Sequence, residues 1–300
     1  MNHSNLINLN YTGSYSLALS VAAASASAFV TDSPSSNQNS PTLDLTFALE
    51  NSWKTISVRI SQVDGELSAL LIANSFQAGL KEIRTNLERI LFLNTDGNAF
   101  ESMVCSDEVL NQSWKRQYGL RPILFPTPFE AAARAIIGHQ LPVSYAATVS
   151  DQIAREYGVM ADLGDRMIHA FPMPEILAEL AFVKGLAARK VEQLRALGKA
   201  AAQSDWLNSE QLKAMPINEA LLKLQQLPGI GPFSAELILI RGAGHTDVFP
   251  KNELRLQRAM TALYHLQVHS DFKELESIAK KWQPFRSWAG LVIRNSVGKQ

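Results

Sequence analysis

Residues 227–242, with the sequence LPGIGPFSAELILIRG, constrain the fold of this chain more than any other stretch. A helical pattern over 218–225 stops before a proline and two glycines, and Pro232 then opens a second helical pattern that runs to residue 242. Glycine tolerates positive φ and lets another molecule approach the backbone closely. Amides at the start of a helix point outward and attract anions. The stretch therefore predicts two helices joined by a tight, anion-binding hairpin, unless it is a glycine-rich turn without a ligand.

Helical patterns continue through most of the chain after Pro122. Thr127 and Glu130 form a capping box, with a proline between them at the first helical position. Apolar residues recur at helical spacing beyond it, and no strand pattern of comparable strength is present. Further helices are expected at 143–157, 174–180, 188–202, 233–242 and 254–266.

The first 115 residues differ in character. Residues 43–48 and 53–60 alternate between apolar and polar side chains and are rich in β-forming types, whereas 76–93 carries apolar residues at helical spacing. We therefore expect an α+β fold of two domains. A small N-terminal α/β domain with an antiparallel sheet would occupy 1–115, and an all-α domain with the hairpin would occupy 116–300.

Charge and cysteine content narrow the function classes. Lysine plus arginine and aspartate plus glutamate each number 28, so the net charge is zero, which weighs against a nucleic-acid partner. Residues 1–115 hold 6 basic and 11 acidic side chains, so any basic surface belongs to the rest of the chain. The single cysteine, Cys105, excludes an internal disulfide and a four-cysteine metal site, and it fits a reducing compartment.

Residues 16–30 form an apolar stretch of the kind found in secretion signals. No basic segment precedes it, and serines interrupt it before it reaches the length of a membrane-spanning helix. We therefore expect a cytoplasmic protein without membrane contact.

Four segments stand in a fixed order along residues 115–300. They are AIIGHQ at 135–140, the hairpin at 227–242, DVFPKNE at 247–253 and WQPFRSWA at 282–289. In this order they resemble the helix-hairpin-helix DNA glycosylase superfamily, and within it 3-methyladenine DNA glycosylase II. The first 110 residues resemble the front domain of that family only in general character.

The resemblance implies that the chain, as a monomer, binds double-stranded DNA that contains a damaged base. Hairpin amides hold a DNA phosphate in this family, which positions the duplex without reading its sequence. Carbonyl oxygens of the same turn hold a monovalent cation, Na⁺ or K⁺, and catalysis needs no cofactor. The matched DNA-binding residues are Gly229, Gly231 and Ser234, together with Gln140 and Leu141, which would fill the gap left by a flipped nucleotide; the matched carbonyls are those of Gln225, Leu227 and Ile230.

The residue two places after the hairpin's last glycine decides the reaction class in this family. A lysine there attacks the sugar and gives a lyase, whereas this chain has Phe233. The resemblance therefore implies a monofunctional enzyme that hydrolyses the N-glycosidic bond with water. Phe233 would line the pocket for the flipped base, unless it is an ordinary core residue. The other matched pocket positions are Leu237, Leu254 and Arg294, which replace aromatic residues and make the pocket less favourable to cationic bases.

Glu253 stands at the matched position of the catalytic aspartate. A carboxylate there stabilises the developing oxocarbenium sugar and positions or deprotonates water. Glutamate is longer by one methylene, which moves the carboxylate by ~1 Å and can cost about a hundredfold in rate. Asp247 ranks second because its family counterpart is structural. Arg241 is a candidate phosphate or ion-pair partner, although an isolated charge is more often on a solvated surface.

Three functions therefore stay open. The first is a glycosylase that removes alkylated bases from duplex DNA, with Glu253 as the catalytic carboxylate. The second is a DNA-binding relative in which the glutamate has ended the chemistry and serves only the helix dipole. The third is a glycosylase for oxidised bases. Only the second would bind damaged duplexes without releasing a base.

Overall fold

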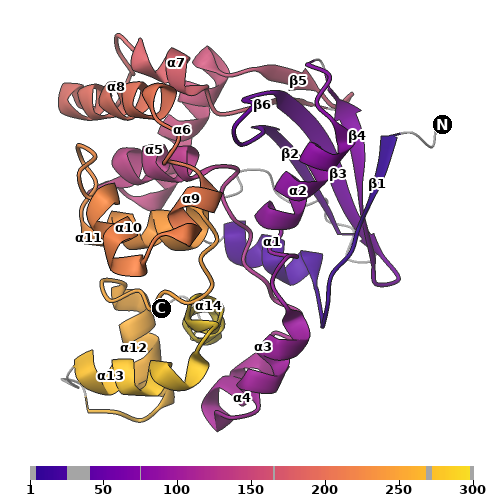
Figure 1. Ribbon diagram of the computed structural model, residues 1–300, viewed down its shortest axis with the longest axis vertical. Helices are drawn as coiled ribbons and strands as arrows, with labels where there is room; N and C mark the ends of the chain where they lie inside the picture. Colours follow the sequence, from indigo (N-terminus) through magenta and orange to yellow (C-terminus); the bar gives the residue numbers. More distant parts are fainter. Residues whose placement is uncertain (1–4, 26–40, 75, 165, 268–271, 298–300) are drawn as a thin grey trace.

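The computed structural model describes residues 5–25, 41–74, 76–164, 166–267 and 272–297. It has an antiparallel four-stranded sheet on one side and a stack of helices on the other (Figure 1). The α+β class expected from the sequence is confirmed. The sheet has the order β1-β4-β3-β2, with β1 at Leu6–Leu9, β2 at Thr42–Ala48, β3 at Thr55–Val63 and β4 at Glu66–Ala73.

The sheet shares its core with two helices, α1 (Leu17–Ser25) and α2 (Leu80–Ile90). Val58 and Ile60 of β3 and Val21 of α1 are buried in this core. The described part of the apolar stretch at 16–30 is therefore a core helix, and residues 26–30 lie outside the described residues. Within the described ranges, every helix is too short or too polar to cross a membrane.

The helical part begins at Thr127, where one half of the predicted capping box is confirmed: Thr127 Oγ1 accepts from the Glu130 amide at 3.0 Å, whereas the Glu130 carboxylate accepts from Arg134. A departure from the all-helical expectation is a two-stranded ribbon, whose strands are too short for alternation to show in the sequence. The ribbon consists of β5 (Met160–Asp162) and β6 (Met167–His169). The helices are α3 (Gly97–Val104), α4 (Glu108–Lys115), α5 (Pro128–Gly138), α6 (Val143–Tyr157), α7 (Pro174–Ala178), α8 (Ala188–Gln203), α9 (Ser209–Ala214), α10 (Ile217–Leu224), α11 (Pro232–Leu237), η2 (Ile238–Gly242), α12 (Leu254–Leu263), α13 (Phe272–Ala279), η3 (Lys280–Trp282) and α14 (Arg286–Ser296).

Helices α3 and α4 precede residue 115, yet they share a core with the C-terminal helices. Phe100 stacks on Trp288 with ring centroids 3.7 Å apart, and Trp114 meets the same ring edge-on. Trp288 Nε1 also donates to the Leu120 carbonyl at 2.7 Å. The expected division at residue 115 stays a prediction, and side chains on both of its sides belong to one hydrophobic cluster.

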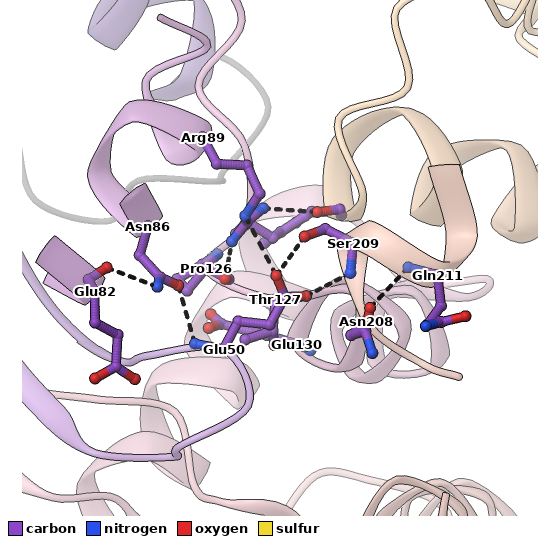
Figure 2. Close-up of polar contacts among 12 residues, drawn as sticks. Glu50, Glu82, Asn86, Arg89, Pro126, Thr127, Glu130, Asn208, Ser209 and Gln211 are labelled. Atoms are coloured by element: carbon purple, nitrogen blue, oxygen red, sulfur yellow. Dashed lines mark hydrogen bonds and ion pairs between the residues drawn. The ribbon is translucent and has the colours of Figure 1, made fainter. Parts of the chain in front are cut away.

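A buried polar network joins the sheet to the helical part (Figure 2). Arg89, on α2, donates to the carbonyl oxygens of Phe125 and Gly242 at 3.1 and 2.9 Å. Glu50, in the turn after β2, accepts from the amide and the hydroxyl of Ser209 and lies 3.6 Å from Arg89 Nε. A buried guanidinium needs such partners. The network therefore fixes the segment before α5 and the end of η2, which both border the site described next.

Candidate active site and DNA-binding hairpin

The hairpin has the form that its sequence predicts. Helix α10 ends at Leu224, α11 starts at Pro232, and η2 extends α11 as a π-helical stretch. In the turn between them, the Ile230 amide donates to the Leu227 carbonyl at 3.1 Å. The Ile230 side chain is buried in the helical core, so it anchors the turn from within.

The two glycines of the hairpin differ in what they require. Gly229 has φ +87°, and a Cβ there would lie 2.7 Å from the side chain of Gln193 on α8. Gly231 is extended and exposed, and a Cβ there would meet nothing within 4 Å. No internal contact therefore requires glycine at 231, whose backbone is open to an external group.

Backbone amides of the turn are open to solvent. Among the described residues, no acceptor lies opposite the amides of Gly229, Gly231 and Phe233. Outward amides at the start of a helix make a positive potential that suits an anion such as a phosphate. Ser234 is buried and lines a neighbouring hollow. If it contacts a phosphate as expected, the contact is made by its backbone amide.

Carbonyl oxygens of the same turn fit the expected cation. The Leu227 oxygen accepts from the Ile230 amide, whereas the oxygens of Gln225 and Ile230 accept no hydrogen bond from the described part of the chain. Hard cations in proteins take oxygen ligands. The turn therefore offers ligands of the right kind for Na⁺ or K⁺.

Two hollows adjoin at α11 and share part of their walls. The larger, of about 380 Å³, lies between α5, α6 and α11, and the smaller, of about 50 Å³, lies between α11, α12 and α14. Concave, mostly apolar walls with a few polar groups are typical of ligand pockets. Of the residues named from the sequence, Gln140, Leu141 and Ser234 line the larger hollow, Glu253 and Arg294 line the smaller, and Phe233 and Leu237 line both.

Glu253 is the residue before α12, and its side chain makes no capping hydrogen bond there. Its carboxylate instead accepts from Arg294 Nη1 of α14 at 2.9 Å. The two side chains are 20% and 21% exposed, so the pair is half-buried at the smaller hollow. Phe233 is 48% exposed beside it, which excludes an ordinary core phenylalanine. The carboxylate therefore faces a hollow and is held by an arginine.

Glu236 is a second carboxylate in the smaller hollow, which the sequence reasoning missed. Its two oxygens accept from the amide and the side chain of Asn252 at 3.1 and 2.9 Å. Burial raises the pKa of Glu236 above its ordinary value, although the bonds from Asn252 act in the opposite direction. Because Asn252 directly precedes Glu253, this contact fixes the loop that carries the candidate catalytic carboxylate. Glu236 could have been found from its spacing of three residues after Phe233, which places both on one helix face.

Arg241 corrects the expectation of a solvated surface charge. It is 9% exposed, lines both hollows and donates from Nη2 to the Ile123 carbonyl at 3.3 Å. Burial and the charge of Arg294 lower the pKa of Arg241 to about 9, which leaves the guanidinium protonated at neutral pH. Phe233, Leu237 and Arg241 follow one another at intervals of four residues, so helical spacing was the signal for this stripe.

The loop after α5 carries the expected wedge residues. Gln140 is exposed with φ +57°, and Leu141 is half-buried. Lys190, on α8, donates from Nζ to the carbonyls of Ile137 and His139 at 2.8 and 2.5 Å. Burial lowers the pKa of this lysine. Lys190 therefore stabilises the C-terminal end of α5 by donating to its carbonyl oxygens. Nothing in its sequence context indicated this role.

Two other residues named from the sequence lie outside the hollows. Leu254 is 61% exposed and is absent from both walls, because it points into solvent from the first turn of α12. Asp247 accepts from Arg286 Nε at 2.7 Å and Nη2 at 3.0 Å. This paired geometry makes Asp247 a structural residue, in agreement with its second rank.

Comparisons with known proteins agree with this arrangement, although no protein-family profile matches the chain. The DNA-3-methyladenine glycosylase of Bacillus subtilis is 26% identical over 202 residues, which are 66% of either protein. DNA-3-methyladenine glycosylase 2 of Escherichia coli is 28% identical over 206 residues, 65% of this chain and 68% of the relative. The match to the first of these thus spans just under two thirds of its length.

The fold has a counterpart among solved structures. The 3-methyladenine DNA glycosylase from Archaeoglobus fulgidus superposes with a TM-score of 0.78 over 97% of each chain, at 20% sequence identity. Both the sheet and the helical stack are covered by that likeness. In its hairpin, its order of motifs and its sequence relatives, the chain is similar to the helix-hairpin-helix DNA glycosylases, and within them to 3-methyladenine DNA glycosylase II.

Proposed function

We propose that this protein is a monofunctional DNA glycosylase of base excision repair, which hydrolyses the N-glycosidic bond of a damaged, alkylated base in duplex DNA. The observation that carries the proposal is the place of Glu253, whose carboxylate lies in a hollow with Phe233 at the start of the hairpin's second helix. The names of the relatives, DNA-3-methyladenine glycosylases, support the substrate class. We expect the enzyme to act as a monomer on cytoplasmic DNA.

In this proposal the hairpin holds the duplex through its backbone. The amides at Gly229 and Gly231 would face a phosphate, and the carbonyls of Gln225, Leu227 and Ile230 would hold Na⁺ or K⁺. The bound cation supplies positive charge next to the phosphate. Such contacts position DNA without lysines, which reconciles DNA binding with a net charge of zero.

The flipped base would occupy the space over Phe233 and Leu237, where the two hollows meet. Gln140 and Leu141 would fill the gap that it leaves in the duplex. This placement brings the sugar to the smaller hollow, where Glu253 lies. The smaller hollow has to widen for the substrate, and Phe233, which is 48% exposed, is the wall residue that would move.

The chemistry follows from the charge that develops on the sugar. The bond from C1′ to the base nitrogen breaks, its electron pair leaves with the base, and the sugar gains oxocarbenium character. The Glu253 carboxylate stabilises this positive charge and takes a proton from the water whose oxygen bonds to C1′. Phe233 offers no amine for a Schiff base, so the products are a free base and an intact abasic strand.

Arg294 supports a catalytic role for glutamate in the place of aspartate. A longer side chain has more rotamers, and loss of position is costly for catalysis. The 2.9 Å bond from Arg294 restricts the carboxylate to one region of the hollow. The arginine thus acts as a positioning residue that offsets the extra methylene.

A single assay tests the proposal. The protein is incubated with duplexes that carry a methylated purine, hypoxanthine or 8-oxoguanine, and abasic sites are then cleaved with alkali. We expect base release without strand cleavage before alkali, and a loss of at least about a hundredfold in single-turnover rate for Glu253→Gln. Glu253→Asp is the matched variant, since it keeps the charge and restores the family residue.

Two outcomes would overturn the proposal. Binding of all duplexes without release of any base would make the chain a non-catalytic DNA-binding relative. Release at the wild-type rate by Glu253→Gln would move the catalytic role to another residue. Release of 8-oxoguanine alone would leave a glycosylase of the same mechanism for oxidised bases.

A further inference from the structure

Arginine side chains line the candidate base site, and their positive charge affects which bases the site can bind. Arg241 lines both hollows, and Arg294 lines the smaller one. Arg134 lines the larger hollow, while its carboxylate partner, Glu130, is absent from the wall. Three arginines therefore line the two hollows between which a flipped base would lie.

The carboxylates of the same space are already engaged. Both oxygens of Glu236 accept from Asn252, and burial raises its pKa. The Glu253 carboxylate accepts from Arg294 and, under the proposed function, must also face the sugar rather than the base. Both carboxylates line the smaller hollow alone, so a base in the larger hollow meets Arg134, Arg241 and mostly apolar surface.

Arg294 still has hydrogen-bond donors to offer. A guanidinium has five N–H donors and no acceptor. Within the described ranges, the one bond recorded for Arg294 is from Nη1 to Glu253. The side chain is 21% exposed at the wall, so a ligand can reach it. Arg294 can therefore keep its carboxylate and donate to a carbonyl oxygen at the same time.

Damaged bases differ in charge, and the arginines interact differently with charged and neutral bases. A purine methylated at N3 or N7 carries a positive charge while it is bonded to the sugar, whereas a deaminated purine or an O-alkylated pyrimidine is neutral. Like charges repel strongly where water is excluded. Tryptophan faces attract cations most strongly, whereas the Phe, Tyr and Trp residues on these walls are two phenylalanines, Phe125 and Phe233.

We propose that Arg294, backed by Arg241, is the specificity-determining residue of this site and selects neutral damaged bases that carry a carbonyl acceptor over cationic alkylated purines. This inference rests on the proposed function and revises its substrate class from alkylated bases in general to neutral damaged bases, alkylated or deaminated. Arg294 donates to the base carbonyl while it keeps Glu253 in place. A cationic base meets two guanidinium groups and gains no hydrogen bond that offsets their repulsion.

The test measures single-turnover release of three bases from otherwise identical duplexes. Hypoxanthine is neutral and has a carbonyl, ethenoadenine is neutral and has none, and 7-methylguanine has a carbonyl but is cationic. We expect the wild type to release hypoxanthine at least about tenfold faster than either of the others. Ratios between bases cancel any general loss of activity in a variant.

Two variants separate the charge of Arg294 from its planar donors. Arg294→Met should shift the ratio of hypoxanthine to 7-methylguanine release by about tenfold or more toward the cation. Arg294→Lys keeps a charge without the fork of donors, so it should slow hypoxanthine release while 7-methylguanine stays disfavoured. Arg155→Met, at an exposed arginine on α6 outside both hollows, is the control and should leave all ratios unchanged.

The outcomes distinguish this inference from the proposed function. If the wild type releases 7-methylguanine faster than hypoxanthine, or if Arg294→Met leaves the ratio unchanged, the selectivity is wrong and the glycosylase stands. If the wild type releases none of the three bases, nor 8-oxoguanine or a second methylated purine, the proposed function fails and the inference with it.

Discussion

The hairpin precedes α11 and the carboxylate hollow lies along α11 and η2, and the two are built in different ways. The hairpin offers backbone groups, at Gly229 and Gly231, and its form depends on residues that are neighbours in sequence. The hollow offers side chains, and its key pair joins Glu253 to Arg294 across 41 residues. Backbone sites depend on local conformation, whereas side-chain sites depend on the packing of distant helices. The two regions should therefore respond to different substitutions.

The largest effect is expected at the support of the hollow. Arg89→Met would remove the donors to the Phe125 and Gly242 carbonyls and leave the Glu50 carboxylate, which is 10% exposed, without its ion-pair partner. Breaking a buried charged pair on one side typically costs about 3–5 kcal/mol. Denaturant unfolding should show a loss of this size. Arg84→Met, at an exposed position of the same helix, is the control. An equal loss of unfolding free energy in both variants would show that the network does not stabilise the fold.

The next effect separates the two glycines of the hairpin. Gly229→Ala should destabilise the fold by about 1–2 kcal/mol because its φ is positive, with a further loss from contact with Gln193. Gly231→Ala should leave unfolding unchanged, since its Cβ meets nothing. It should weaken DNA binding by about tenfold if a phosphate approaches there.

The control for the steric part is a double variant. Adding Gln193→Ala to Gly229→Ala should restore the contact-dependent share of stability and leave the backbone share lost. Equal unfolding free energies for Gly229→Ala and Gly231→Ala would contradict the distinction drawn between the two positions.

A smaller effect is expected where the two regions share a support. Lys190 holds the end of α5, and Gln193, one turn later on α8, packs at Gly229. Lys190→Met should leave two carbonyls without a donor and slow base release by about tenfold through the wedge loop. Arg189→Met removes the same charge at an exposed neighbouring position. Equal rates of base release in Lys190→Met and Arg189→Met would show that Lys190 acts through its charge alone and not through its bonds to α5.

The smallest effect is a pH dependence of stability from Glu236. Because burial raises its folded pKa above the ordinary value, the folded state binds the proton more tightly than the unfolded state. Stability should therefore fall as pH rises from the ordinary pKa through the raised one, and then level off. Glu236→Gln should lack this fall, which urea unfolding at a series of pH values would measure. A fall of equal size in the variant would assign it to another group.

The comparison also explains what the sequence could predict. The capping box of α5 and the proline and glycines of the hairpin are local signals, and each specifies a local conformation that the structure contains. The ribbon of β5 and β6 gave no such signal because three residues are too few to show a period. Alternation found β2 and β3, since one face of each packs against a core.

The hollow was predictable only in part. Of the matched positions, Phe233, Leu237, Glu253 and Arg294 line one hollow, whereas Leu254 faces solvent. Arg241 was expected on the surface, because its burial depends on packing against residues far away in sequence, which no local pattern shows. The pairing of Glu253 with Arg294 arises where α12 and α14 pack side by side, and no local pattern specifies that register.

The most direct measurement compares Glu253→Gln with Gly231→Ala in two assays, affinity for a damaged duplex and the rate of base release at saturating protein. We expect Glu253→Gln to keep wild-type affinity and to lose about a hundredfold or more in rate. Gly231→Ala should lose affinity by about tenfold and keep the rate of the bound complex. Base release at the wild-type rate by Glu253→Gln would contradict the assignment of chemistry to the carboxylate hollow and of binding to the hairpin.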